Sequence, residues 1–168
     1  MVLGFMQFFD KQKKEPTHFR EKILVGAGFI PQNPNIHPKG LIDFIGRPKI
    51  HTIRRDPHNR WKAGRKIEMV YRGAGYRIID HFNKGIPELE KCVSVQKIEI
   101  KWTDVKKPFG LGITKHPIVV IDNARFNGQS SHILQLAIND GFKDLDQFFR
   151  WFNKDFSGNL IHWTDLKY

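Results

Sequence analysis

The stretch at residues 46–56, Gly-Arg-Pro-Lys-Ile-His-Thr-Ile-Arg-Arg-Asp, combines basic and hydroxyl side chains that could act together on a polar ligand. Its main candidates for a functional site are Lys49, Thr52 and Arg54, which carry an ammonium, a hydroxyl and a guanidinium group. Successive side chains of a strand point to opposite faces, so Lys49 and Thr52 converge only if the strand bends or carries a bulge. Pro48 and Gly46 favour such a bend. The spacing alone does not identify the chemistry.

The positive charge of the chain is concentrated around this stretch. There are 28 Lys and Arg against 17 Asp and Glu, a formal net charge of +11 and a pI near 9.9. Residues 46–72 hold nine basic and two acidic residues, so seven of the eleven net charges lie there. Arginine suits bidentate phosphate contacts, and nearby aromatic residues can stack on bases. We therefore predict a polyanionic partner, the alternative being a basic surface that binds nothing. The predicted nucleic-acid-binding residues are Arg47, Lys49, His51, Arg54, Arg55, Arg60, Trp61 and Lys62. For Trp61, a core position is the equal alternative.

Several other kinds of site are excluded by their missing motifs. The chain has no GxxxxGK[ST] loop and no GxGxxG sequence that opens a helix, so we predict no nucleotide cofactor. Its eight histidines form no HxxxH or HExxH pair, and we predict no metal. A single cysteine, Cys92, permits no internal disulfide and fits a reducing, cytoplasmic compartment. The apolar start at 1–9 is too short to span a bilayer, so we predict no membrane partner. The oligomeric state stays open.

Hydrophobic periodicity predicts a mixed α+β chain. We expect strands at 2–8, 49–54, 66–71, 92–102, 116–122 and 160–163. We expect helices from Pro16 or Thr17 to Gly26 or Gly28, from Ser130 or Ser131 to Gly141, and behind a capping box at 144–147. Within 92–102 the alternation slips between Val95 and Ile98, which predicts a bulge. The sequence predicts one domain over 1–168, a small β-barrel flanked by helices, with a Pro- and Asn-rich loop or insertion at about 28–40.

Two motifs in this order resemble a known family. Gly46, Lys49 and the run 52–54 (Thr-Ile-Arg), followed by the run 61–64 (Trp-Lys-Ala-Gly), are similar to the ASCH domains of the PUA-like superfamily. The segments 93–99, 136–142, 148–152 and 161–163 are similar as well, so the likeness covers most of the chain except the loop at 28–40. The resemblance implies an open PUA-like barrel with a cleft that binds RNA or a modified nucleoside.

The same resemblance implies an alternative, because some small bacterial members are amidohydrolases that deacetylate acetylcytidine with a lysine, a threonine and a glutamate. Carried over by motif, these fall on Lys49, Thr52 and Asp140. This chain departs from the pattern in having Asp for Glu and an extra residue, Pro48. A desolvated lysine near cations can act as a base toward a hydroxyl or water, and a carboxylate can pass the proton on. An amidohydrolase or ribonuclease, an RNA-binding module and a protein-interaction domain therefore remain open, and Asp140 is otherwise an exposed residue at a helix end.

Overall fold

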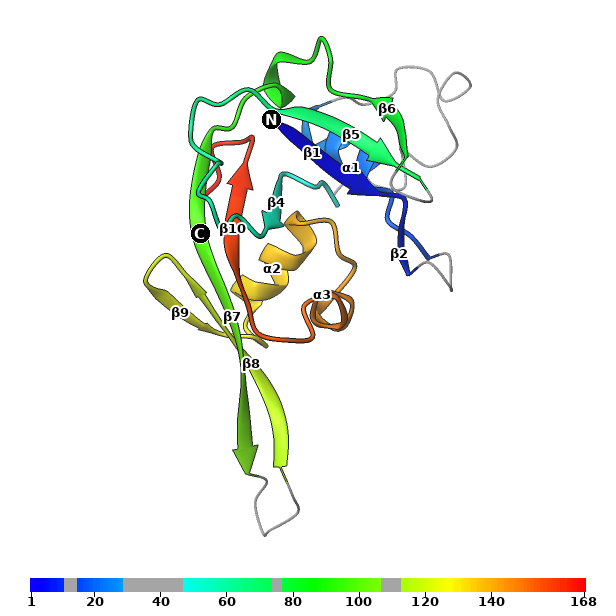
Figure 1. Ribbon diagram of the computed structural model, residues 1–168. Helices are drawn as coiled ribbons and strands as arrows, with labels where there is room; N and C mark the ends of the chain where they lie inside the picture. The colour runs from blue at the N-terminus through cyan, green and yellow to red at the C-terminus, as the bar shows by residue number, and fades with distance from the viewer. Residues whose placement is uncertain (11–14, 29–46, 74–76, 107–112) are drawn as a thin grey trace.

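A computed structural model of the protein describes residues 1–10, 15–28, 47–73, 77–106 and 113–168. Within these ranges the chain forms three α-helices, one 3-10 helix and ten strands, so the α+β prediction is confirmed (Figure 1). The elements in chain order are β1 (Val2–Met6), β2 (Phe8–Asp10), β3 (Glu15–Pro16), α1 (Phe19–Gly26), β4 (His51–Arg54), β5 (Glu68–Arg72), β6 (Ile78–His81), η3 (Pro87–Leu89), β7 (Ser94–Lys106), β8 (Ile113–Ile121), β9 (Ala124–Asn127), α2 (Ser131–Asn139), α3 (Leu145–Trp151) and β10 (Phe156–His162). The predicted loop at 28–40 lies, from residue 29 onward, outside the described residues.

The strands form three sheets. The largest is antiparallel with the order β4-β10-β7-β8-β9, the second has the order β1-β5-β6 with β1 parallel to β5, and the smallest is the pair β2-β3. Backbone hydrogen bonds join the segment before β5 to the segment before β7, from the N–H of Gly64 to the carbonyl of Cys92 (2.7 Å) and from the N–H of Cys92 to the carbonyl of Arg65 (2.8 Å). None of the sheets formed by the described strands closes into a barrel. The outer part of the β7–β8 hairpin projects away from the rest of the molecule (Figure 1).

Local sequence signals placed most elements correctly. The N-caps of the two C-terminal helices are confirmed, because the Ser130 side chain accepts a hydrogen bond from the N–H of Ile133 and Asp144 accepts one from the N–H of Gln147 (2.8 Å). Strands β2, β3, β6 and β9 were not predicted as separate strands. β9 pairs only with β8 and carries a single large apolar residue, Phe126, so its alternation is too weak to recognise.

The predicted bulge in β7 is wrong. This strand pairs with β10 and β8 without a shift of register, and Ser94, Gln96, Ile98 and Ile100 are all buried on one face. Val95 packs on the opposite face against a different hydrophobic cluster. The apparent slip of the alternation arises because this part of β7 is covered on both faces. Apolar side chains are therefore buried whether they point to one face or to the other.

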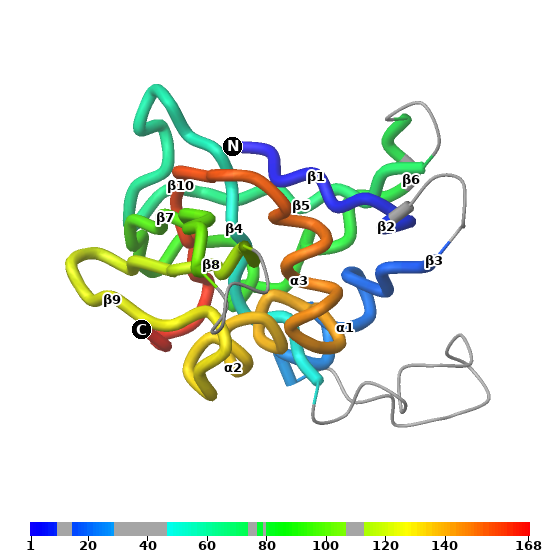
Figure 2. The backbone as a smooth tube through the Cα atoms, turned by 90° about the horizontal axis from the view of Figure 1, so that it is seen from below, coloured from blue at the N-terminus to red at the C-terminus, as the bar shows by residue number. Residues whose placement is uncertain are grey.

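Two hydrophobic clusters account for this double cover. The first, which packs around β1, α1 and β5, includes Leu3, Phe5, Met69 and Trp163. The second lies between the large sheet and the pair of helices α2 and α3, which lie side by side in Figures 1 and 2. It includes Ile53, Ile98, Leu136 and Phe148. Strands β4 and β10 are buried between the two clusters, so the stretch that holds Lys49 to Arg54 lies largely inside the protein.

Candidate functional site

Strand β4 divides the predicted site residues between the two faces of the large sheet. It pairs with β10, with His51 opposite His162 and Arg54 opposite Asn159. Ile53 belongs to the cluster under α2 and α3, so His51 shares that face while Thr52 and Arg54 point the other way. His51 is therefore separated by the sheet from Thr52 and Arg54.

Lys49 and Asp140 form a buried ion pair. Their exposed fractions are 1% and 3%, and the Lys49 ammonium donates to the carboxylate of Asp140 and to its backbone carbonyl oxygen (2.5 Å). The rings of Phe5 and Phe19 lie beside the ammonium, with centroids at 5.7 and 4.6 Å. Asp140 is the residue after α2, where Gly141 turns the chain away with a φ of 90°. The resemblance placed these two residues in one set, and the structure brings them into contact across 91 positions of sequence.

Burial controls the charge of this pair. Removal from water lowers the pKa of Lys49 to about 8, with a smaller lowering contribution from nearby Arg54 and against the opposing effect of Asp140. Burial also raises the pKa of Asp140, while Lys49 opposes that rise. A lysine of this pKa is a competent base near neutral pH, but its ammonium is enclosed by Asp140 and the two rings. A substrate reaches it only after one of these groups moves. Thr52 is buried as well, and its hydroxyl makes no hydrogen bond among the described residues.

A second lysine is hydrogen-bonded to the same end of α2. The Lys22 ammonium donates to the carbonyl oxygen of Gly141 (2.6 Å), and burial lowers the pKa of Lys22 to about 8. The backbone N–H of Lys49 in turn donates to the carbonyl of Lys22 (3.0 Å). Cations near a helix C-terminus offset the negative end of the helix dipole. α1, β4 and the end of α2 are thus fixed to one another by polar contacts inside the protein.

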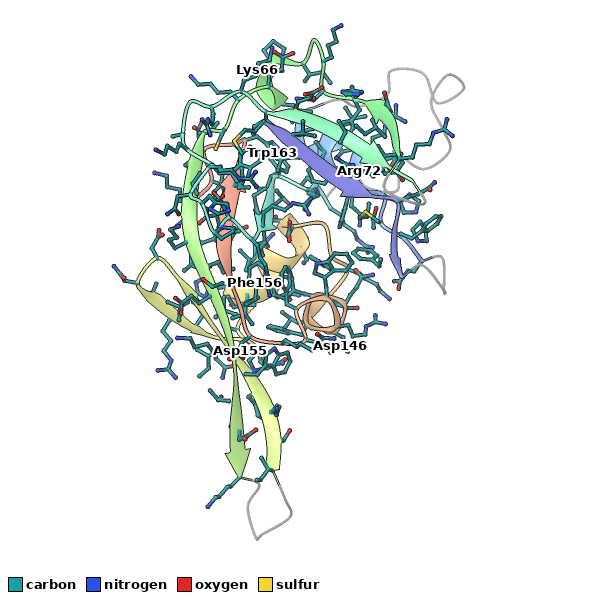
Figure 3. The ribbon with its side chains drawn as sticks, viewed as in Figure 1. Lys66, Arg72, Asp146, Asp155, Phe156 and Trp163 are labelled. Carbon is teal, nitrogen blue, oxygen red and sulfur yellow. The ribbon has the colours of Figure 1, made fainter. Side chains whose placement is uncertain are left out.

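Four arginines meet at the surface in an open cleft of about 530 Å³, here called the arginine cleft. Its lining consists of Arg54, Arg55, Arg60, Arg72 and Trp61 together with Met1, Val2, Leu3, Gly4 and Met6. Figure 3 shows Arg72 on the β1–β5 sheet. A Cβ atom on Gly4 would lie 2.3 Å from Nε of Arg72, so glycine is what lets that side chain cross β1. No acidic residue occurs among the described residues that line the cleft.

Arg54 connects the arginine cleft with the buried pair. Its guanidinium donates to the carbonyl of Gly4 (2.8 Å) and lies over the ring of Phe5, with its central carbon 5.3 Å from the ring centroid. The same ring contacts the Lys49 ammonium, and the charge of Arg54 acts on both Lys49 and Asp140. Lys49 and Asp140 therefore lie behind the wall of the cleft, separated from it by Arg54 and Phe5.

A tight loop at 56–61 presents Arg60 to the arginine cleft. The buried carboxylate of Asp56 accepts hydrogen bonds from the backbone N–H groups of Arg60 and Trp61 (both 2.9 Å) and from the side-chain amide of Asn159 (3.1 Å). Burial acts to raise the pKa of Asp56, but these hydrogen bonds outweigh it and the pKa is lowered. Asp56 thus holds the loop as a charged acceptor, and the Arg60 side chain remains 59% exposed.

Of the other predicted binding residues, Trp61 lines the arginine cleft, whereas Arg47, His51 and Lys62 do not. Arg47 and Lys62 are exposed but do not line the arginine cleft, and Trp61 is only 6% exposed, so most of its ring packs in the core. His51 is fully buried on the α2 side, 5.3 Å between ring centroids from both His162 and Tyr168. Sequence reasoning did not select Arg72, although it lies in the basic window. It had no means of finding Gly4, whose contribution is the absence of a side chain.

The described residues offer no alternative site of a familiar kind. No group of three or more His, Cys, Asp or Glu side chains is placed to hold a metal ion in this part of the chain. None of its helices is long and apolar enough to cross a membrane. No family model matches the chain, and neither a curated protein nor a solved structure is significantly similar to it. The similarity to ASCH domains therefore rests on the motif residues.

Proposed function

We propose that this protein binds single-stranded RNA, or a modified nucleoside carried on RNA, with phosphate groups in the arginine cleft. The observation that carries the proposal is the composition of that cleft, in which four arginines occur without an acidic residue among the described lining. Like charges around one hollow repel each other, and a bound phosphate backbone removes that repulsion. Arginine also matches the geometry of a phosphate group better than lysine does.

The cleft suits an extended anion better than a free nucleoside. The arginines come from both ends of the 54–60 segment and from β5, so three separate parts of the chain contribute positive charge to the lining. A strand of nucleotides offers a phosphate to several of them, whereas an uncharged nucleoside offers none. The ASCH resemblance, with the PUA-like barrel that it implies, supports the same assignment and remains part of the proposal.

The test is the binding of a short single-stranded RNA measured by fluorescence anisotropy over a salt series. The affinity should fall steeply with salt, and each arginine removed should reduce the slope of log K against log salt by about 0.7. Arg55→Ala and Arg60→Ala are the variants, because both side chains are exposed. Arg125→Ala and Lys154→Ala are matched controls, since both residues are exposed and do not line the cleft. Absent binding, or equal slopes for all four variants, would overturn the proposal.

A second candidate function, hydrolysis of an acetylated cytidine or of RNA, is favoured by the contact between Lys49 and Asp140. In this role Lys49 would act as the base, Thr52 would supply or hold the attacking oxygen, and Asp140 would pass the proton to the leaving group. The test is incubation with acetylcytidine and with RNA, followed by chromatography of the products. Activity that is lost in Thr52→Val, with folding shown by circular dichroism, supports an enzyme. Unchanged substrates in both incubations exclude this role.

A further inference from the structure

A second, smaller hollow lies beside the arginine cleft and shares one residue with it. The hollow has a volume of about 360 Å³ and is lined by Arg55, Glu99, Ile100, Lys101, Asp155, Phe156 and Ser157. Arg55 also lines the arginine cleft, so the two hollows meet at this side chain. Figure 3 shows Phe156 and Asp155 together near the start of β10, while Arg72 lies on the other sheet. The volume lies within the range of about 300–1,000 Å³ that is usual for small-ligand pockets.

The second hollow differs from the first in its charge. Its two cations, Arg55 and Lys101, are balanced by two anions, Glu99 and Asp155. Both anions already have partners, since Glu99 is 3.0 Å from the Lys101 ammonium and Asp155 accepts a hydrogen bond from the N–H of Trp102 (2.9 Å). This hollow is therefore polar but electrically neutral, and nothing in it favours a phosphate over an uncharged ligand.

The hollow also contains a cation–π contact between two planar groups. The guanidinium of Arg55 lies over the ring of Phe156, with its central carbon 5.5 Å from the ring centroid. The ring is half-buried and makes an edge contact with Phe152, at 5.0 Å between centroids. Arg55 itself is exposed. Unpaired bases stack on aromatic rings and on arginine guanidinium planes, and such contacts tolerate any base.

We propose that the second hollow is a nucleobase subsite, in which a base stacks on the Arg55–Phe156 pair while the adjoining phosphates lie in the arginine cleft. The inference rests on the proposed function and adds that phosphates and bases bind in different hollows. A positive cleft next to a neutral, aromatic hollow matches the alternation of phosphates and bases along a single strand. Arg55 serves both parts, because its charge faces the phosphates and its plane faces the base. The exposed hydroxyl of Ser157 and the ion pair of Glu99 with Lys101 supply polar groups at the edge of the hollow.

The test separates base stacking from phosphate binding by comparing two probes, a short oligouridine and an inorganic polyphosphate of similar charge. Phe156→Leu removes the ring but keeps an apolar side chain in contact with Phe152. It should weaken binding of the oligouridine about tenfold, the size of one lost stacking contact, and leave polyphosphate binding unchanged. Phe126→Leu, a half-buried phenylalanine on β9, is the matched control and should change neither affinity. Thermal unfolding of both variants shows that they fold.

The outcomes distinguish this inference from the proposed function. If both probes bind and Phe156→Leu leaves the affinity for oligouridine unchanged, the base subsite is refuted while the arginine cleft stands. The same holds if Phe156→Leu weakens both probes equally, because the ring then acts only through Arg55. If neither probe binds to the wild-type protein, the proposed function itself fails.

Discussion

The contact between Lys49 and Asp140 predicts a large energetic coupling that a double-mutant cycle can measure. Lys49→Met keeps most of the volume of the side chain but removes the ammonium, leaving the Asp140 carboxylate buried without its main partner. Asp140→Asn keeps the shape but removes the negative charge, leaving the Lys49 ammonium beside two aromatic rings. The double variant places two uncharged side chains in the same space.

The magnitude follows from the burial of both partners. With exposed fractions of 1% and 3%, either charge left alone carries a desolvation cost that water cannot relieve. Breaking a buried ion pair from one side costs about 3–5 kcal/mol of unfolding free energy. We expect Lys49→Met near the upper end, because two hydrogen bonds are lost, and Asp140→Asn near the lower end, because the amide oxygen still accepts one. The double variant should lose less than the sum, with a coupling energy of about 2 kcal/mol or more.

Urea unfolding of the wild type, the two single variants and the double variant measures the four free energies of unfolding. The comparison is valid if the slope of the unfolding free energy against urea concentration is the same in all four proteins. Lys97→Met is the matched control, because Lys97 is exposed and its ammonium bonds to the side chain of Asn59 (2.6 Å). Its effect should stay within about 0.5 kcal/mol. Losses below about 1 kcal/mol in both single variants, or losses that simply add in the double variant, would show that the buried pair is not formed.

Two further predictions concern other buried groups. Burial lowers the pKa of His162 to about 4 and that of His51 well below its usual range, whereas both histidines titrate near 6.5 in the unfolded chain. The unfolded chain therefore binds more protons below pH 6.5, and the free energy of unfolding should fall as the pH is lowered from 6.5. His162 should contribute up to about 1.4 kcal/mol per pH unit down to about pH 4, and His51 should act in the same direction. Urea unfolding at several pH values measures this, and a flat profile between neutral pH and pH 5 would contradict it. Asp56→Ala should destabilise the protein by about 2 kcal/mol, because the N–H groups of Arg60 and Trp61 lose their acceptor. In the RNA assay it should weaken binding through Arg60, and an affinity equal to that of the wild type would show that the loop does not position this residue.

The fold was predictable wherever a local signal decides the structure. The caps at Ser130 and Asp144 were found because a capping residue acts on its own first helical turn. The alternation in β7 was misinterpreted because it depends on tertiary cover, since Val95 and Ile98 pack against clusters on opposite sides of the sheet. A sequence pattern shows which residues are apolar but does not show how many faces of a strand are covered.

The site was predictable only in part, for the same reason. The basic window included Arg54, Arg55 and Arg60, which line the arginine cleft, because net charge can be read without knowing the fold. It also suggested His51, which β4 turns toward the interior. The contact of Asp140 with Lys49 spans 91 positions and carries no spacing signal, so only the likeness to a family motif pointed to it.

The two faces of β4 explain how one short stretch can serve both stability and binding. Its interior contacts hold the strand rigid, because Lys49 is tied to the end of α2 and Ile53 packs under the helices. A strand fixed in this way fixes the direction of Arg54, whose guanidinium is held by the carbonyl of Gly4 and the ring of Phe5. An arginine held in place loses less conformational freedom when a phosphate binds to it. The buried ion pair therefore supports the arginine cleft even if it takes no part in chemistry, and loss of RNA affinity in a Lys49 variant would not by itself identify a catalytic lysine.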